Sequence, residues 1–232
     1  MQAMILAAGR GERMRPLTDR TPKPLLPVGG KPLIVWHLER LAAAGFRDVV
    51  INHAHLGAQI ETALGNGARW GLAIRYSPEP EGALETAGGI AQALPLLGSA
   101  PFLVINGDIF CDWDVAQAAL AAGDCAHLVM VNNPPQHPQG DFVLQDGKVG
   151  AEGAPKFTFS GIGVYRPELF SSIVRGRPAK LAPLLRVAMG ETRVSGELHR
   201  GRWTDVGTPE RLAQLDAELG MFAGAGAAHP SL

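Results

Sequence analysis

The sequence predicts an α/β fold with a Rossmann-like, three-layer, mixed but mostly parallel sheet and a small β-rich insertion. Short runs rich in Val and Ile alternate with longer segments of helical period through the first half of the chain. After residue 132 this alternation gives way to a hairpin pattern that turns at Asp146-Gly147. We therefore expect a single domain over residues 1–222, with a β-rich portion at roughly 133–200 and a flexible tail over 223–232.

Each expected element follows from its local pattern. Short apolar runs predict the strands Ala3–Leu6, Asp48–Asn52, Leu72–Tyr76, Phe102–Asn106, His127–Asn132, a hairpin over Asp141–Val149, Phe157–Tyr165 and Thr192–His199. Apolar residues at helical spacing predict the helices Leu33–Ala44, Leu56–Leu64, Thr86–Leu97, Val115–Ala122, Pro167–Val174, Pro183–Met189 and Pro209–Leu219. Pro32 suits the start of the first helix, and Gly45 suits its end.

Composition excludes several classes of protein. The 232 residues are 46% hydrophobic and 19% charged, which is typical of a globular domain with a buried core. Because 21 Lys and Arg balance 22 Asp and Glu, no overall field attracts the chain to nucleic acid or to a membrane. No run approaches the ~20 apolar residues of a membrane helix. The two cysteines suit a reducing compartment, so we expect a cytoplasmic protein.

A glycine loop follows the first strand. Gly9 and Gly11 let the backbone approach a phosphate, and ligands of open parallel sheets bind where strands end in such loops. The basic residues of this region are Arg10, Arg13, Arg15, Arg20, Lys23 and Lys31, against Glu12 and Asp19. This local excess of positive charge indicates a polyanionic ligand. Met14 breaks a dinucleotide fingerprint, and Pro32 after Gly30-Lys31 breaks a Walker loop.

Two carboxylates stand where a metal site is expected. Asp108 follows an apolar strand and a glycine, and Asp205 precedes the last expected helix. Mg²⁺ is usually held by one or two carboxylates together with substrate phosphates and water. Position alone equally allows Asp108 to cap a turn and Asp205 to cap the last helix.

Four segments together carry a family resemblance. Leu6–Thr18, Pro22–Leu25, Asn106-Gly107-Asp108 and Trp203–Pro209 resemble, in order, the motifs of the sugar-1-phosphate nucleotidylyltransferases. These enzymes join a nucleoside triphosphate to a sugar phosphate. The resemblance implies a fold of the nucleotide-diphospho-sugar transferase type, whose β-rich portion binds the sugar.

The resemblance also implies roles for individual residues. Lys23 would neutralise the α-phosphate, Arg13 would hold the β- and γ-phosphates, and Asp108 would complete the catalytic group. The implied nucleotide-binding residues are Ala7, Ala8, Gly9, Gly11, Arg13, Lys23, Glu85, Thr86, Gly88 and Asn106. The implied sugar-binding residues are Gly140, Asp141, Ser160, Glu197 and Asp205. Asp108 and Asp205 would hold the cofactor, Mg²⁺, and Lys156 is a candidate for the family's second sugar-site lysine.

The substrates follow from a narrower resemblance. Leu84–Ile90, Gly140-Asp141-Phe142 and Phe157–Pro167 look like the N-acetylmuramate α-1-phosphate uridylyltransferases of peptidoglycan recycling. This resemblance implies UTP and N-acetylmuramic acid 1-phosphate as partners in the reaction. The alternatives are a mannose-1-phosphate guanylyltransferase, another enzyme of the family, or a non-catalytic nucleotide-sugar sensor. Both a monomer and a small homo-oligomer remain open.

Overall fold

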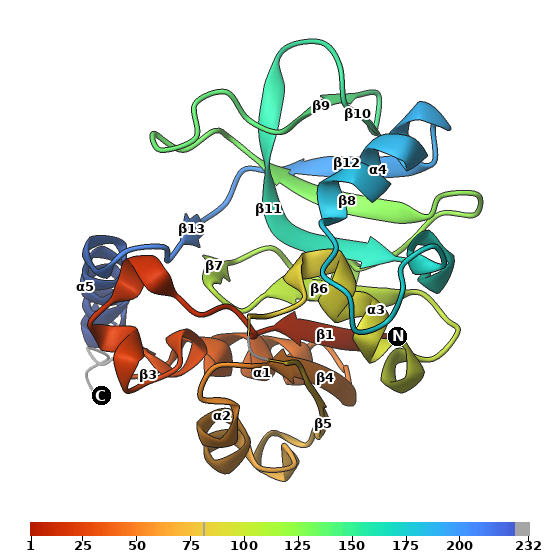
Figure 1. Cartoon of the computed structure of the whole chain (residues 1–232). Helices are drawn as coiled ribbons and strands as arrows, with labels where there is room; N and C mark the ends of the chain where they lie inside the picture. Colours follow the sequence, from red (N-terminus) through yellow and green to blue (C-terminus); the bar gives the residue numbers. More distant parts are fainter. Residues whose placement is uncertain (81, 226–232) are drawn as a thin grey trace, which may run out of the picture.

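A nine-stranded sheet forms the centre of the computed structural model, which describes residues 1–80 and 82–225 (Figure 1). Its strands are β1 (Gln2–Leu6), β4 (Asp48–His53), β5 (Ala73–Pro78), β6 (Phe102–Asn106), β8 (Ala126–Val131), β9 (Phe142–Gln145), β10 (Lys148–Gly150), β11 (Lys156–Tyr165) and β12 (Val194–His199). They lie side by side in the order β5-β4-β1-β6-β11-β8-β12-β10-β9. Every expected strand is therefore present within a residue or two of its expected bounds.

The sheet has two differently built halves. Strands β5, β4, β1 and β6 are all parallel, as the alternating pattern predicts. Beyond them, β11 runs antiparallel to both β6 and β8, while β8 and β12 are parallel. The hairpin of β9 and β10 turns at Asp146 and Gly147, which both have positive φ, as expected for Asp-Gly. The sheet is mixed as predicted, but parallel pairing dominates only its first half.

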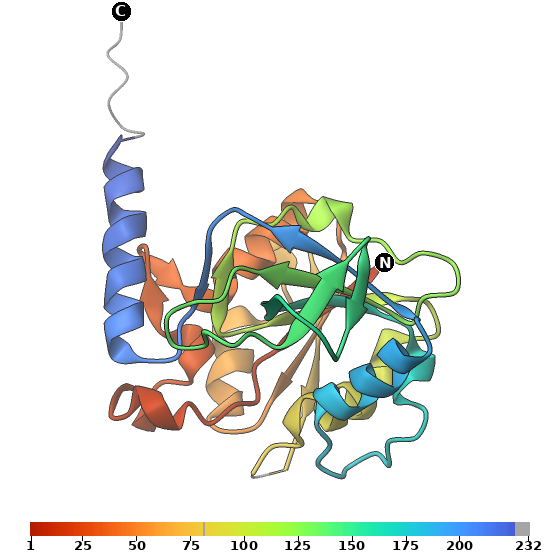
Figure 2. The same ribbon diagram turned by 90° about the horizontal axis from the view of Figure 1, so that it is seen from above.

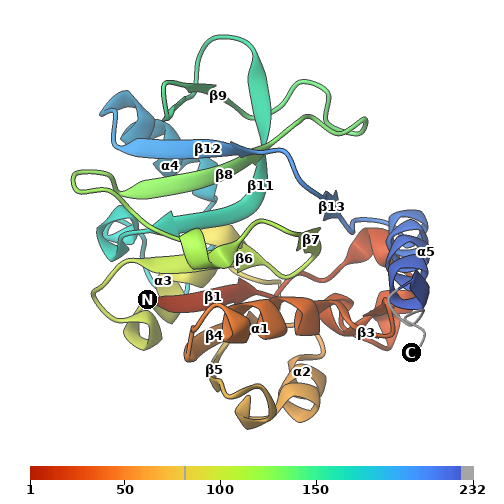
Figure 3. The same ribbon diagram turned by 180° about the vertical axis from the view of Figure 1, so that it is seen from behind.

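Helices cover both faces of the sheet. They are α1 (Leu33–Ala43), α2 (Gly57–Leu64), α3 (Glu85–Leu97) and α4 (Leu181–Gly190). Along β1, Ala3 and Ile5 pack into the core under α1 and α2, whereas Met4 packs into the core under α3 and α4. Accordingly, α3 lies in front of the sheet in Figure 1 and α1 lies in front of it in Figure 3. The three-layer prediction is confirmed, since β1 is apolar on both faces.

Helix α5 (Pro209–Ala225) stands at one side of the molecule (Figure 2). It packs Leu212, Leu215 and Leu219 against Met14 and Val28, and so joins the end of the chain to its first loop. The helix continues past the expected end at Leu219, and residues 226–232 of the expected tail lie outside the described residues. Among the residues described, no helix has both the length and the hydropathy needed to cross a bilayer.

Two small antiparallel pairs were not expected from the sequence. Strands β2 (Pro27–Val28) and β3 (Lys31–Pro32) form one pair, and β7 (Ile109–Cys111) and β13 (Trp203–Asp205) form the other. The second pair joins the segment after Asp108 to the segment that contains Asp205. It therefore brings together two of the motifs that the sequence analysis singled out.

The expected helix over Val115–Ala122 is wrong. Only a single 3₁₀ turn forms, from Val115 to Gln117. The Asp114 carboxylate accepts a hydrogen bond from the Ala116 N–H, which caps this turn, but the chain then leaves the helical conformation at Ala118.

The expected helix over Pro167–Val174 is also wrong, because it stops as a 3₁₀ turn at Phe170. From there the chain runs to the start of α3, where the Ala179 carbonyl accepts hydrogen bonds from the N–H groups of Ala87 and Gly88. This tertiary pairing satisfies two of the free N–H groups of α3 and draws the connecting segment away from a helix.

Candidate active site

Two adjoining cavities open at the carboxyl ends of the parallel strands, where an open α/β sheet binds its ligands. The first has a volume of about 350 Å³ and the second about 230 Å³. Asn106, at the end of β6, and Asp108, two residues later, line both cavities. A ligand in one cavity therefore meets a ligand in the other at these two residues.

Most of the expected nucleotide-binding residues line the first cavity. They are Ala7, Ala8, Gly9, Gly11, Arg13, Lys23, Glu85, Thr86 and Asn106. Gly88 is the exception, since it packs against the chain that passes over the start of α3. A Cβ at Gly88 would lie 2.5 Å from the Arg177 carbonyl oxygen, so its small size serves this close packing.

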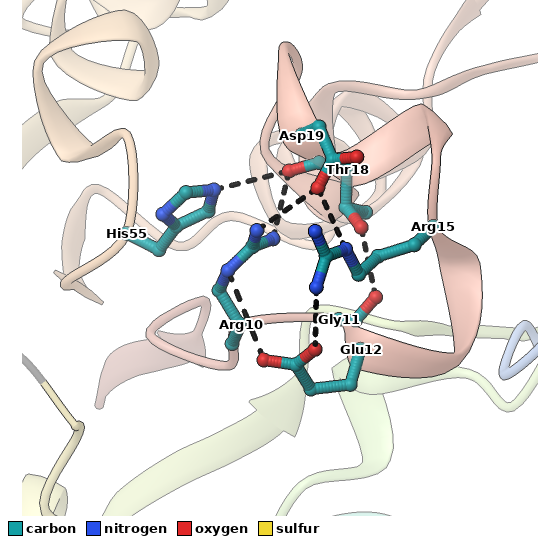
Figure 4. Close-up of polar contacts among 7 residues, drawn as sticks. All are labelled: Arg10, Gly11, Glu12, Arg15, Thr18, Asp19 and His55. Atoms are coloured by element: carbon teal, nitrogen blue, oxygen red, sulfur yellow. Dashed lines mark hydrogen bonds and ion pairs between the residues drawn. The ribbon is translucent and has the colours of Figure 1, made fainter.

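The glycine loop holds itself in shape through charge pairs (Figure 4). Asp19 accepts hydrogen bonds from Arg15, at 2.8 Å, and from Arg10, at 3.1 Å, and these arginines hold the pKa of its carboxyl below the ordinary value. Arg15 and Arg10 also pair with Glu12. Arg10 and Arg15 therefore pair with acidic residues of the loop itself, although the sequence suggested them as part of a positive region for a polyanionic ligand. Arg13 and Lys23 are the cations of this segment that line the first cavity.

Thr18 holds the glycine loop in position through hydrogen bonds. It is fully buried; its hydroxyl donates to the Gly11 carbonyl at 2.8 Å, and its own carbonyl accepts from Arg10 at 2.9 Å. A ring nitrogen of His55 lies 3.0 Å from the same carbonyl oxygen (Figure 4). Gly11 has φ +70°, and a Cβ there would lie 2.9 Å from the Thr18 methyl group. The close turn of the loop therefore needs glycine at this position.

Lys23 and Asp108 form an ion pair at the junction of the two cavities. The Lys23 Nζ atom lies 2.6 Å from Asp108 Oδ2, although 85 residues separate them in the sequence. Lys23 begins a 3₁₀ turn between Pro22 and Pro24, which restrict its backbone. The Lys23 side chain is nearly buried, whereas that of Asp108 is 39% exposed.

Asp205 lies beside Asp108 and has a cationic partner of its own. The N–H of Val206 donates to the Asp108 carbonyl at 2.9 Å, which joins the two segments. Asp205 Oδ2 accepts a hydrogen bond from Arg211, at 2.7 Å, in the first turns of α5. A Cβ on Gly207 would lie 2.5 Å from the Arg211 guanidinium and 3.0 Å from that of Arg13. The guanidinium groups of Arg211 and Arg13 thus gather over Gly207 together with the Asp205 carboxylate, whose Oδ1 would lie 3.0 Å from the same Cβ.

Asn52 and Glu79 line the first cavity but were not singled out from the sequence. Asn52 is the next-to-last residue of the buried strand β4, and its amide accepts from the Ala7 N–H at 2.8 Å and donates to Glu79 at 2.6 Å. Glu79 also accepts from the Leu84 N–H at 2.7 Å. The sequence signal that could have identified them is their position at or just after the carboxyl ends of two predicted strands. They tie the glycine loop to the segment before α3.

Three of the expected sugar-binding residues, Asp141, Ser160 and Asp205, line the second cavity. The other two do not. Gly140 packs in the turn before Asp141, with φ +63°, where a Cβ would lie 2.9 Å from the Lys156 carbonyl oxygen. The Glu197 carboxylate, on β12, accepts from the Trp113 indole at 2.7 Å, and this partner keeps it outside both cavities.

Asp108 and Asp205 both line the second cavity and offer carboxylate oxygens, the type of ligand that a divalent cation prefers. A different group, Cys111, Asp112 and His199, also has ligand atoms within 4.8 Å of one another. There, however, His199 already bonds Asp112 at 2.7 Å, and burial raises the pKa of the Cys111 thiol to about 11. Polar contacts within the protein therefore account for this second group.

The arrangement defines a class of protein: an α/β domain with a glycine loop, a lysine and two carboxylates at two adjoining cavities. The chain belongs to the nucleotidyl transferase family, whose model matches residues 2–220. An N-acetylmuramate alpha-1-phosphate uridylyltransferase from Neisseria meningitidis serogroup B is 60% identical over 230 residues, covering 96% of this chain and 100% of that protein.

Two more distant relatives are named for the same substrate and for a different one. The N-acetylmuramate alpha-1-phosphate uridylyltransferase of Caulobacter vibrioides is 36% identical, over 94% of this chain and 96% of its own length. A mannose-1-phosphate guanylyltransferase of Mycobacterium tuberculosis is 32% identical over 94% of this chain, which spans 64% of that protein.

Solved structures confirm the Rossmann-like nucleotidyltransferase fold. The inositol-1-phosphate CTP transferase of T. maritima superposes with a TM-score of 0.76 at 18% identity, over 98% of both chains. A Bacillus anthracis protein solved in complex with sucrose superposes with a TM-score of 0.81 at 23% identity, over 95% of both chains.

Proposed function

We propose that this protein joins UTP and N-acetylmuramic acid α-1-phosphate to give UDP-N-acetylmuramic acid and pyrophosphate. The observation that carries the proposal is the pair of cavities that meet at Asn106 and Asp108, with Lys23 at the junction. One cavity suits the triphosphate and the other the sugar phosphate. The choice of UTP and the muramate is supported by the 60% identical relative, which is named for that reaction and matches over its whole length.

The reaction requires two polyanions to meet. An oxygen of the sugar phosphate attacks the α-phosphorus of UTP; a new P–O bond forms, and the bond from the α-phosphorus to the bridging oxygen breaks. Pyrophosphate leaves with the electron pair. Such a transfer depends mainly on positioning and on neutralising charge. Lys23 is placed to neutralise the α-phosphate, because its ammonium group lies where the two cavities join.

The leaving group needs cations of its own. Arg13 lines the first cavity, and its guanidinium lies over Gly207 together with that of Arg211. We assign both arginines to the β- and γ-phosphates, with Arg211 also orienting Asp205. The N–H groups around Gly9 and Gly11 would bind further phosphate oxygens.

Mg²⁺ fits the donor set at the cavity junction. Asp108 and Asp205 both line the second cavity and offer the oxygen ligands that Mg²⁺ prefers, with the remaining positions left to phosphates and water. When bound there, Mg²⁺ supplies charge neutralisation for the reacting phosphates. In the chain alone, Lys23 and Arg211 provide the counter-charges of these two carboxylates.

We further propose that the enzyme acts in peptidoglycan recycling, because its proposed product is a nucleotide-activated muramic acid. Two buried free cysteines support a reducing compartment, and we assign the reaction to the cytoplasm.

Pyrophosphate release tests the proposal directly. Purified protein with Mg²⁺ is offered UTP, dTTP, GTP, CTP and ATP, each crossed with the 1-phosphates of N-acetylmuramic acid, N-acetylglucosamine, glucose and mannose. We expect selective turnover of UTP with the muramate. Turnover of GTP with mannose 1-phosphate would replace both substrates, whereas nucleotide binding without any turnover would support a sensor.

A further inference from the structure

The second cavity has an unusual charge balance for the proposed sugar. Of the described residues that line it, three are carboxylates, Asp108, Asp141 and Asp205, and none is Lys or Arg. Among these described lining residues, His137 is the one that can carry a positive charge. An anionic group entering this cavity therefore depends on His137, on neutral donors, or on a bound cation.

His137 is paired on one side and open on the other. Its Nε2 atom lies 3.1 Å from Asp141 Oδ1, while Asp141 Oδ2 accepts from the Phe159 N–H at 2.8 Å. The Nδ1 atom makes no contact with a polar partner in the part of the chain that the structure describes. With its side chain 42% exposed, the ring has one nitrogen held by the protein and one available to a ligand.

The segment that carries His137 is fixed in place. Asn133 donates from its amide to the carbonyls of Pro138, at 3.1 Å, and Lys156, at 2.9 Å. The same amide oxygen accepts from the Thr158 hydroxyl at 2.9 Å. These bonds tie the loop between β8 and β9 to β11, so little conformational freedom is lost when a ligand binds.

N-acetylmuramic acid differs from N-acetylglucosamine by a lactyl ether at C3, which ends in a carboxylate. The sugar phosphate therefore carries two anionic groups on different ring carbons. Asp108 and Asp205, with a bound cation, account for the phosphate. The lactyl carboxylate needs a separate donor, because no Lys or Arg is among the described lining residues and Lys23 and Arg211 are already paired with Asp108 and Asp205.

We propose that His137 recognises the lactyl carboxylate through Nδ1, with Asp141 holding the ring through Nε2. Donation from both nitrogens requires the imidazolium form, which supplies the missing positive charge. Gln136, also in the cavity wall, adds a neutral amide donor. This inference rests on the proposed function, and it makes His137 a specificity residue for sugar phosphates with an anionic substituent.

The test compares three sugar 1-phosphates at saturating UTP: N-acetylmuramic acid, its lactyl methyl ester, and N-acetylglucosamine. The ester keeps the size of the lactyl group but removes its charge. In His137→Ala we expect kcat/KM for the acid to fall about tenfold or more, mainly through KM, since a hydrogen bond to a charged group is lost. Turnover of the ester and of N-acetylglucosamine 1-phosphate should change by less than about twofold.

Gln139→Ala is the matched control, because Gln139 is exposed on the same loop and does not line the cavity. His137→Gln keeps an N–H donor without the charge and should give a smaller loss, and it replaces the alanine variant if that protein does not fold. An equal loss for acid and ester, or no loss for either, overturns the assignment of His137. Failure of the wild-type protein to use the muramate at all would instead overturn the proposed function, and this inference with it.

Discussion

The Lys23 ammonium group lies 2.6 Å from the Asp108 carboxylate, and this contact joins the two residues to which we assign the α-phosphate and the metal. In the free chain each neutralises the other, so the nearly buried lysine has a counter-charge before any ligand arrives. When the substrates and a cation bind, Lys23 gains phosphate oxygens as further partners, and Asp108 gains the cation. The ion pair therefore positions both groups before the reaction begins.

Replacing Lys23 with methionine keeps most of the side-chain volume and removes the charge. We expect turnover to fall on the order of 10²-fold or more, because the charge acts on the transition state. Stability should change little, since Asp108 remains 39% exposed to water. Pyrophosphate release and thermal melting measure the two effects. Lys31→Met, whose lysine pairs with Glu39 away from the cavities, is the control. Near-normal turnover in Lys23→Met would remove this residue from the mechanism.

Asp108→Asn should lower stability as well as activity. It leaves the buried Lys23 ammonium without a counter-charge, which we expect to cost about 1–3 kcal/mol of unfolding free energy. It also removes one metal-binding charge, so activity should fall and half-maximal activity should require more Mg²⁺. Urea denaturation and a Mg²⁺ titration separate these effects, with the exposed Asp114→Asn as control. An unchanged Mg²⁺ titration would count against Asp108 as a ligand.

Glu85 lines the first cavity at the start of α3 with φ +55°, a left-handed conformation that is unfavourable for a glutamate side chain and that glycine adopts freely. Glu85→Gly relieves this strain but increases the entropy of the unfolded chain, so the unfolding free energy should change by less than about 1 kcal/mol. We expect the selectivity between nucleotides or sugars to change instead. Glu85→Gln separates charge from shape. If the glycine variant selects its substrates as the wild-type protein does, Glu85 has no role in specificity.

Site residues that belong to a local motif were predictable from the sequence. The positions of Lys23 and Asp108 follow from a matched motif and from a strand end, and both line the cavities. The contact between Asn52 and Glu79 was not predictable in the same way, because it joins the ends of two neighbouring strands and depends on the order of the sheet. Arg211 was missed because only the docking of α5 brings it to Asp205.

The residues that the structure leaves outside the cavities have the same explanation. Gly88 lies in a motif beside Thr86, but the helix turns it toward the segment that crosses α3. Glu197 lies on a strand of the β-rich portion, and Trp113, far away in sequence, provides its partner. A motif identifies the neighbourhood of such residues, whereas packing decides which side chains enter the cavity.

His37 makes the stability of the fold depend on pH. It lies in α1, is 2% exposed, and its Nε2 atom has no hydrogen-bond partner among the described residues. Burial, and then the nearby charge of Arg40, lower its pKa from 6.5 to about 4. Between these values the unfolded chain binds a proton that the folded protein does not bind. The unfolding free energy should therefore fall as the pH drops from about 6.5 to 4, by up to about 3 kcal/mol from this residue.

Urea denaturation at several pH values measures this dependence of the unfolding free energy on pH in the wild-type protein and in His37→Gln, which has no titrating ring. The variant should lose less stability than the wild-type protein over that range, even though the carboxylates titrate in both. Equal slopes would mean that His37 does not stay neutral in the folded state.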